Sequence, residues 1–188
     1  MKTRIICVRV CDLYDQWWED NLRHMIDTYS GIEYDEFVCI RDEEFEMPVA
    51  NKLLMFDRYR DGQNLYFDLD VLIKGDCNQF FTQDLHVCHA WWREAWHTPL
   101  NSSIISWQGD RSDVYNEFAS DPEYHMFKYN KGIDQYLYER KNPKTFVEGF
   151  VSFQNMIEES DEFDVYLFNQ RMEFLRSTPW CQKYLRSQ

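Results

Sequence analysis

The stretch Asn64–Asp76, which reads NLYFDLDVLIKGD, ends an apolar run with two aspartates one residue apart. The letters LYF before the pair are typical of a buried strand. Successive side chains of a strand alternate between its faces, so Asp68 and Asp70 are expected to point the same way and Leu69 into the core. An unpaired charge is costly to bury. The pair therefore predicts a functional site at the end of a central strand.

A divalent cation between the two carboxylates would relieve their mutual repulsion. Mg²⁺ and Mn²⁺ prefer oxygen ligands, and they need few from the protein when a diphosphate supplies others. Ligands of open parallel sheets gather beyond the carboxyl ends of the strands, where this pair is expected to lie. Because aspartate is frequent in the chain, a D-x-D triplet alone decides nothing. The predicted metal site rests on the position of Asp68 and Asp70 after a buried strand.

The residues before this stretch alternate between strand and helix patterns. Runs of β-branched and apolar residues indicate strands, and apolar positions at helical spacing indicate helices. The predicted elements are a strand at 3–10, a helix at 13–29 capped by Asp12, a strand at 34–40, a helix at 49–59 and a strand at 64–70. This order predicts the beginning of a parallel α/β sheet with right-handed crossovers.

The second half predicts shorter and more mixed elements. We expect strands at 85–92, 102–107, 146–153 and 163–168, helical or turn-rich segments across 111–140, and a closing helix at 178–187. No internal repeat or linker interrupts the sequence. A chain of 188 residues is long enough for one sizeable core, so we expect a single domain over residues 1–188.

The charge, the hydropathy and the cysteine content of the chain argue against several classes of protein. The chain carries 20 basic and 33 acidic side chains, a net charge of -13, which argues against nucleic acid as a partner. No apolar stretch approaches the roughly 20 residues of a membrane span, and the N-terminal residues do not resemble a signal peptide. We expect a soluble, cytoplasmic protein. The six cysteines form no C-x-x-C pair, which favours reduced core thiols over disulfides or zinc ligands.

Aromatic residues make up 18% of the chain and include seven tryptophans. Several tryptophans stand beside polar residues, in DQWWED, HAWWREAW and STPWCQKY. Such segments form stacking surfaces for sugars or bases, and they equally form helix faces that pack on a sheet. Packing in the core is the favoured interpretation for most of these tryptophans.

The motif YFDLDVLIKGD resembles the metal motif of nucleotide-sugar-dependent glycosyltransferases of the GT-A fold, most of all glycosyltransferase family 8. Four more segments are similar to this family in its own order along the chain: VRVCDLY, NKLLMF, NSSIISW and GIDQYLY. The resemblance implies a Rossmann-like mixed central sheet flanked by helices. It also implies a retaining hexosyltransferase that uses a nucleotide diphosphate donor, with a UDP-sugar favoured, and a glycan, lipid or protein acceptor.

The resemblance assigns five residues to the nucleotide half of the donor. Tyr14 would lie on the nucleobase with Asp12 nearby, and Lys52 would reach the diphosphate or the sugar. Asp70, assisted by Asp68, would hold Mn²⁺ or Mg²⁺ across the diphosphate.

Four further residues are assigned to the sugar half. Asn101 and Ser102 would border the donor sugar, Asp134 would hold its hydroxyls, and Gln135 would lie near the anomeric carbon. Asp134 and Gln135 are therefore the predicted catalytic residues. Each position also has a structural interpretation, since Asn101 can cap a turn and Asp134 can cap the helix that follows it.

The sequence departs from the family pattern in two places. The family carries a late His-x-Gly segment whose His is a third metal ligand, whereas this chain reads VYLFNQRMEF. Asn169 or Gln170 could offer a carbonyl oxygen there. Ser103 stands where the family's Asn-Ser-Gly motif has glycine.

Two other interpretations remain open at the level of sequence. FDLDVLI also resembles the first motif of haloacid-dehalogenase-type phosphatases, in which Asp68 would be the nucleophile and Asp70 an acid and base, with GDRSD at 109–113 as a late acidic motif. The strand–helix–strand–helix unit before the pair argues against this family. The second alternative is a non-catalytic GT-A-like protein that binds a nucleotide or a glycan, or only a partner protein.

Overall fold

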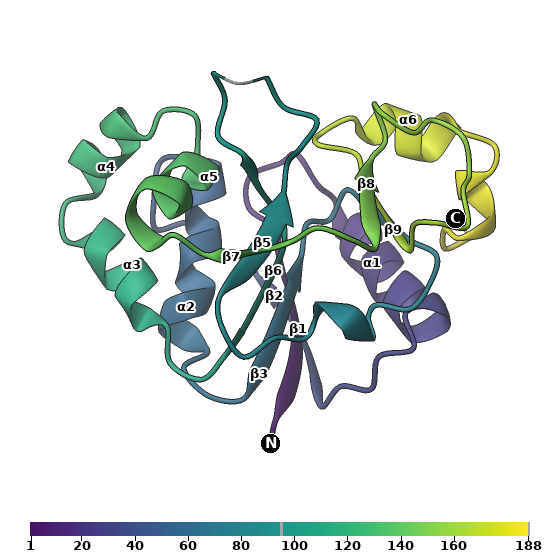
Figure 1. Cartoon of the computed structure of the whole chain (residues 1–188). Helices are drawn as coiled ribbons and strands as arrows, with labels where there is room; N and C mark the ends of the chain where they lie inside the picture. Colours follow the sequence, from purple (N-terminus) through teal and green to yellow (C-terminus); the bar gives the residue numbers. More distant parts are fainter. Residues whose placement is uncertain (95, 188) are drawn as a thin grey trace.

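A six-stranded mixed sheet forms the centre of the computed structural model, which describes residues 1–94 and 96–187 (Figure 1). Its strand order is β2-β1-β3-β6-β5-β7. The strands are β1 (Thr3–Val8), β2 (Glu36–Ile40), β3 (Gln63–Phe67), β5 (His86–His89), β6 (Leu100–Gln108) and β7 (Lys144–Phe146). Strand β1 is parallel to β2 and β3, β6 is antiparallel to β3 and β5, and β7 is parallel to β5. The parallel beginning and the mixed second half agree with the predicted fold class.

Helices cover both faces of this sheet (Figure 1). Helix α1 (Gln16–Tyr29) lies on one side, and a second group lies on the other: α2 (Leu54–Arg58), α3 (Ser112–Ala119), α4 (Pro122–Lys128) and α5 (Ile133–Tyr136). The alternation of strand side chains explains the two layers. In β1, Ile5 belongs to the buried cluster that contains Leu22 of α1, whereas Ile6 belongs to the cluster that contains Phe56 of α2. Both faces of β1 are therefore buried.

A smaller sheet lies beside α1 and has the order β4-β9-β8. Its strands are β4 (Val71–Ile73), β8 (Phe150–Ser152) and β9 (Val165–Leu167), and helix α6 (Met172–Ser177) follows β9. Because β4 follows the aspartate pair directly, its pairing with β9 brings the C-terminal segment against that pair. The backbone N–H of Phe168 donates to the carbonyl of Asp70 at 3.2 Å.

The predicted closing helix at 178–187 is wrong. The helix of this region is α6, which ends at Ser177, and only a short 3₁₀ turn, Cys181–Lys183, follows it. Proline disfavours the helical conformation in the residue before it, and Pro179 follows Thr178, whose backbone is extended at φ -75° and ψ 119°.

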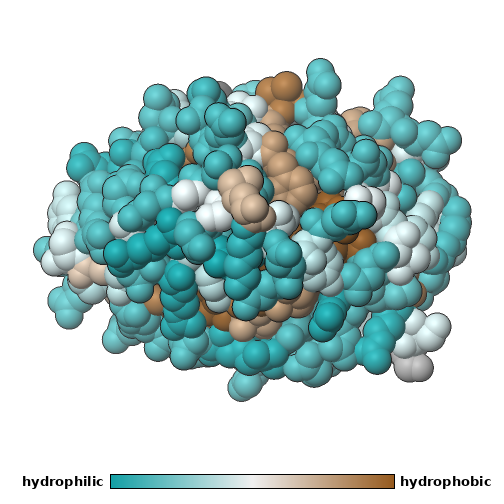
Figure 2. Space-filling model, turned by 90° about the horizontal axis from the view of Figure 1, so that it is seen from below, coloured by the Kyte–Doolittle hydropathy of each residue, from teal (hydrophilic) through white to brown (hydrophobic). Residues whose placement is uncertain are grey.

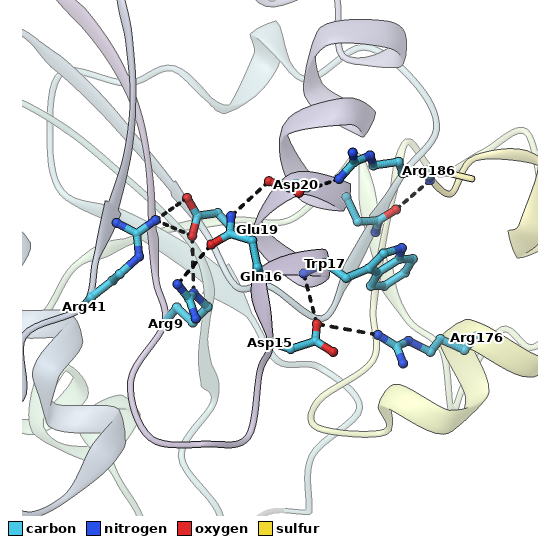
Figure 3. Close-up of polar contacts among 10 residues, drawn as sticks. Arg9, Asp15, Gln16, Trp17, Glu19, Asp20, Arg41, Arg176 and Arg186 are labelled. Atoms are coloured by element: carbon cyan, nitrogen blue, oxygen red, sulfur yellow. Dashed lines mark hydrogen bonds and ion pairs between the residues drawn. The ribbon is translucent and has the colours of Figure 1, made fainter. Parts of the chain in front are cut away.

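The N-cap of helix α1 lies three residues after the predicted one. Asp15, and not Asp12, is the N-cap, and its carboxylate accepts the backbone N–H of Trp17 at 3.0 Å. Figure 3 shows this cap together with Arg176, whose guanidinium lies 3.9 Å from the same carboxylate. Cys11 has a left-handed φ of 53°, so the chain turns between β1 and α1 before the helix starts.

Glu19, in the first turn of α1, ties the helix to the ends of two strands. Its carboxylate lies 2.6 Å from the guanidinium of Arg41, after β2, and 3.3 Å from that of Arg9, after β1 (Figure 3). An acidic side chain in the first turn also complements the helix dipole. These contacts hold the β1–α1 connection in place.

Two other predicted elements are divided. The helix at 49–59 is a 3₁₀ helix, Pro48–Leu53, that continues into α2. The strand at 146–153 is split into β7 and β8, which belong to different sheets. Gly149, between them, has a left-handed φ of 82°, and a Cβ atom there would lie 2.5 Å from the side chain of Gln79.

Figure 2 shows one face of the molecule, on which hydrophilic residues surround small apolar areas, in keeping with a net charge of -13. All six cysteines are free; Cys7, Cys77, Cys88 and Cys181 are buried and Cys11 is exposed. Among the described residues, no helix is both long and apolar enough to cross a membrane.

Candidate functional site

A cavity of about 600 Å³ opens beyond the carboxyl ends of β1 and β3. This is the position in which sheets of this kind bind ligands. Segments far apart in the sequence form its walls: the β1–α1 turn, the 3₁₀ helix before α2, the end of β3, the start of β6, the start of α5 and the loop after β9. Seven of the predicted site residues line it: Tyr14, Lys52, Asp68, Asp70, Asn101, Ser102 and Asp134.

Asp68 is held by two neighbours at the end of β3. Its Oδ1 lies 2.5 Å from Nζ of Lys52, and the hydroxyl of Tyr66 donates to the same oxygen at 2.5 Å. The ammonium of Lys52 also lies 5.2 Å from the centre of the Tyr66 ring. Both charged side chains are mostly buried, at 13% and 20% exposed. The cation predicted to reach a diphosphate therefore stands beside the first aspartate.

Asp70 is almost completely buried, at 3% exposed. Its carboxylate accepts the backbone N–H of Gln170. Burial is the main reason that the pKa of Asp70 is raised to about 6, and the negative charge of Asp68 adds to the effect. Burial and the charges of both aspartates also raise the pKa of Tyr14. The carboxylates of Asp68 and Asp70 thus stand close enough to disfavour each other's charge, and the ammonium of Lys52 offsets part of this effect.

An unusual loop presents the N–H of Gln170 to Asp70. Asn169 and Gln170 both have left-handed backbones, with φ of 52° and 68°, in which residues other than glycine are uncommon. Asn169 is fixed by its side chain, because its Oδ1 accepts from Nδ2 of Asn101 at 2.9 Å. The loop stands where the family's histidine segment was expected.

The start of β6 is fixed by its own polar groups and by α5. Oδ1 of Asn101 accepts the N–H of Ser103 at 2.9 Å. Oδ1 of Asp134 accepts the N–H of Ser102 at 3.0 Å, and its Oδ2 lies 2.9 Å from Nη2 of Arg93. Both carboxylate oxygens of Asp134 thus have partners within the chain.

Two predicted residues, Asp12 and Gln135, do not line the cavity. Asp12 is exposed in the turn before α1, where Cys11 and Tyr14 face the cavity instead. The side chain of Gln135 runs along its own helix, and its Nε2 donates to Glu139 at 2.8 Å. In this conformation neither residue is in position to contact a molecule in the cavity.

Arg93 and Lys131 are the charged residues of the cavity that the sequence did not indicate. Arg93 lies in the loop between β5 and β6 and meets Asp134 41 residues later, a pairing that no local pattern shows. Lys131 precedes α5, and its ammonium donates to the carbonyl of Trp96 in the same loop at 2.9 Å. The signal that could have drawn attention to them is the cluster of tryptophans around Arg93.

The geometry argues against the phosphatase interpretation. Strands β3 and β6 are antiparallel, with Phe67 opposite Ile104 and Gln63 opposite Gln108. The acidic segment at 109–113 follows the carboxyl end of β6, and Asp68 follows the carboxyl end of β3. Because the two strands are antiparallel, these ends lie at opposite edges of the sheet. About four residues of strand, or roughly 14 Å, separate the two ends. The two acidic motifs cannot act on one phosphate.

Within 1–94 and 96–187, no group of three or more His, Cys, Asp or Glu side chains could hold a metal. The carboxylates that line the cavity at the predicted metal site are those of Asp68 and Asp70, while the amide oxygen of Asn169 in the facing loop already accepts from Asn101. A hard cation at this site would have to take most of its ligands from a bound molecule. Mg²⁺ is commonly bound in this way, by one or two carboxylates together with the phosphates of a substrate.

Comparison with solved structures finds the same fold in glycosyltransferases. A glycosyltransferase involved in glycosylation of the major capsid of PBCV-1 has a TM-score of 0.70 at 9% identity, covering 94% of this chain and 98% of that one. The galactosyltransferase LgtC, in complex with donor and acceptor sugar analogues, has a TM-score of 0.64 at 10% identity, covering 98% and 97%. GlyE of Streptococcus pneumoniae TIGR4 has a TM-score of 0.63 at 8% identity, covering 89% and 54%.

No family model and no curated protein sequence matches the chain. The structural similarities show that it has a glycosyltransferase fold of the GT-A type, as predicted. Family 8 in particular remains a prediction, because identities of this size show the fold alone.

Proposed function

We propose that the chain is a glycosyltransferase that moves a sugar from a nucleotide diphosphate donor, with a UDP-sugar favoured, to an acceptor. The observation that carries the proposal is the convergence of Tyr14, Lys52, Asp68 and Asp70 on one cavity of a glycosyltransferase fold. These side chains combine a ring for a base, a cation for a diphosphate and two carboxylates for a metal.

In this proposal the pyrophosphate lies against both Lys52 and the aspartate pair, which are in contact with each other. Asp70 and Asp68 would hold Mn²⁺ or Mg²⁺, which would neutralise the charge that develops on the nucleotide leaving group. Lys52 supplies a second positive charge beside them. Tyr14 stacks on the base, because its ring lines the cavity at the edge of the β1–α1 turn.

The sugar lies toward β6 and α5 in the same proposal. Asn101 and Ser102 border it, and Asp134 accepts from its hydroxyls while remaining paired with Arg93. No side chain is required as a covalent nucleophile, so the site acts by positioning and by charge neutralisation. We expect the product to retain the anomeric configuration of the donor, which proton NMR of the product would show.

Calorimetric titration with UDP-sugars, with and without Mn²⁺, tests the metal part of the proposal. We expect weak binding of UDP-glucose or UDP-galactose alone and much tighter binding with Mn²⁺, because two carboxylates make an incomplete shell. Asp70→Asn should abolish the Mn²⁺-dependent part. Asp161→Asn, at a fully exposed position, is the matched control and should bind as the wild type does. Unchanged Mn²⁺-dependent affinity in Asp70→Asn would refute the metal role.

A non-catalytic binding protein is the second candidate. The observation that favours it is that only Asp68 and Asp70 stand at the predicted metal site: in the described chain no group of three acidic, cysteine or imidazole ligands forms, and Asp134, the third carboxylate of the cavity, is paired with Arg93. A binding protein of this kind is expected to bind a nucleotide sugar tightly in the presence of Mn²⁺ and to release no UDP, whichever acceptor is added. The transferase predicts slow release of UDP even to water, which is a poor substitute for a positioned acceptor.

A further inference from the structure

The loop between β5 and β6 carries two tryptophans that are largely exposed. Trp91 is 51% and Trp96 is 68% exposed. Figure 1 shows this loop projecting beyond the end of the sheet, between α5 on one side and the C-terminal helix α6 on the other. Tryptophan offers a large area for burial, so leaving two of them in solvent on one loop indicates a surface that binds something.

The described residues on either side of residue 95 are held by contacts of their own. The N–H of Ala90 donates to the carbonyl of Pro99 at 2.7 Å and closes the base of the loop, and the N–H of His97 donates to the carbonyl of Glu94 at 2.8 Å. Trp92 packs edge-on against Phe150 of β8, at 6.1 Å between ring centres. The exposed rings are therefore presented by a fixed base.

Two residues connect Trp96 to the cavity. Lys131 lines the cavity, and its ammonium both donates to the carbonyl of Trp96 and lies 5.2 Å from the centre of the Trp96 ring. Arg93, in the same loop, also lines the cavity and pairs with Asp134 there. Trp96 consequently stands at the rim of the cavity, in direct contact with one of its walls.

From this arrangement we propose that Trp96 is the platform on which a carbohydrate acceptor stacks. This inference rests on the proposed function, since the acceptor must place one hydroxyl beside the donor sugar. A pyranose ring has one face of C–H groups, which packs on an aromatic face, and a rim of hydroxyls, which needs hydrogen-bonding partners. The ammonium of Lys131 lies over the indole and the His97 ring is tilted against it at 4.8 Å between ring centres, so the sugar is proposed to stack on the part of the indole that stays exposed, with the Lys131 ammonium as a donor to its hydroxyls.

The neighbours of the ring favour a sugar over a lipid chain. A lipid would require a continuous apolar surface, whereas the described residues next to Trp96 are polar or charged: Glu94, His97 and Lys131. The acceptor expected from this surface is a neutral glycan and not an acyl chain.

Transfer and donor hydrolysis, measured side by side, test the proposal. Lactose, cellobiose and maltose serve as acceptors with UDP-glucose and UDP-galactose. We expect Trp96→Ala to raise the KM for the accepted disaccharide about tenfold, which corresponds to the loss of one stacking contact of about 1.4 kcal/mol. Hydrolysis of the donor in water should be unchanged within about twofold. Trp96→Phe keeps an aromatic face and should recover most of the loss.

Phe127→Ala is the matched control, because Phe127 is an exposed aromatic residue on α4 at 84% exposure and does not line the cavity. It should leave both rates unchanged. A normal disaccharide KM in Trp96→Ala, with hydrolysis intact, would overturn the proposal. Loss of hydrolysis and transfer together in Trp96→Ala would also contradict it, since that would place Trp96 in the donor site.

Direct sugar binding separates this inference from the proposed function. Saturation-transfer NMR with the same three disaccharides needs neither donor nor turnover. If the protein binds these sugars through Trp96 but never releases UDP, the transferase assignment is wrong and the carbohydrate surface is confirmed. Donor turnover without any Trp96-dependent binding of these sugars would show that the platform is wrong while the transferase assignment stood.

Discussion

Asp70 is the residue at which stability and the proposed function conflict. A buried carboxylate beside a second carboxylate is unfavourable in the metal-free protein, and its raised pKa expresses this cost. Functional sites often contain such locally unfavourable arrangements, which the remaining structure tolerates. The position of both aspartates at the end of a central strand could be predicted from the sequence alone, because the apolar residues before them show the pattern of a buried strand. The sequence could not show that Asp68 would be paired with Lys52 or that Asp70 would receive an N–H from a loop 100 residues away.

Asp70→Asn is expected to stabilise the metal-free protein at neutral pH. With a folded pKa of about 6 and an ordinary carboxyl pKa near 4 in the unfolded chain, wild-type stability falls as the pH rises from about 4 to 6. The variant lacks this loss, so its free energy of unfolding should exceed that of the wild type by about 1–3 kcal/mol at pH 7.5 and by much less at pH 4. Urea denaturation at the two pH values measures the difference. Destabilisation at pH 7.5 would show that the charge is satisfied without a metal.

Lys52→Met separates the contribution of the Lys52 ammonium to UDP binding from that of the metal ion. Because Lys52 is proposed to contact the diphosphate itself, its loss should weaken UDP binding about tenfold or more both with and without Mn²⁺. Asp70→Asn, by contrast, should remove only the Mn²⁺-dependent part. Calorimetry on both variants tests this contrast, and Arg60→Met, an exposed cation outside the cavity, provides the control. Equal UDP affinity in Lys52→Met and the wild type would place Lys52 outside the donor site.

At the scale of elements, local signals identified most strands but misplaced several ends. The cap of α1 was assigned to Asp12 because it stands before the apolar periodicity, whereas the left-handed turn at Cys11 postpones the helix to Asp15. The helix expected at 178–187 does not form, because α6 ends at Ser177 and Pro179 disfavours a helical backbone at Thr178. At both boundaries a local backbone preference, of the turn at Cys11 or of the residue before Pro179, outweighed the helical spacing of apolar residues.

The N-cap of α1 gives a stability test with an internal control. Asp15→Ala removes the acceptor for the Trp17 N–H and the partner of Arg176, so it should lower the free energy of unfolding by about 1 kcal/mol. Asp12→Ala, at the position that the sequence favoured, should leave it unchanged. Urea denaturation of both variants decides between them, and an equal loss in Asp12→Ala would contradict the observed cap.

At the scale of the whole molecule, the alternation of the first 76 residues predicted the parallel half of the sheet, because each of its elements is continuous in sequence. The small sheet β4-β9-β8 could not be predicted in the same way, since it joins strands nearly a hundred residues apart and three residues long. The cavity depends on that sheet, which holds Asn169 and Gln170 against the aspartates. Arg93 and Lys131 are equally non-local, since their partners Asp134 and Trp96 lie 41 and 35 residues away.

The same packing predicts a single unfolding transition. Val165 of the small sheet and Leu22 of α1 belong to one buried cluster with Leu65 of the central sheet, so the two sheets should not unfold separately. Tryptophan fluorescence and far-ultraviolet circular dichroism should give coincident urea curves. Two separated transitions would show that residues 1–188 do not form one cooperative domain.

Release of UDP is the measurement that tests the central claim most directly. Wild type, Asp70→Asn and the exposed control Asp161→Asn are incubated with UDP-glucose or UDP-galactose, with Mn²⁺ or with a chelator, and UDP is followed by chromatography. The account predicts slow, Mn²⁺-dependent release by the wild type and the control, faster release when an accepted disaccharide is present, and none by Asp70→Asn. Equal release by Asp70→Asn and the wild type, or no release by any of them with any donor and acceptor, would contradict it.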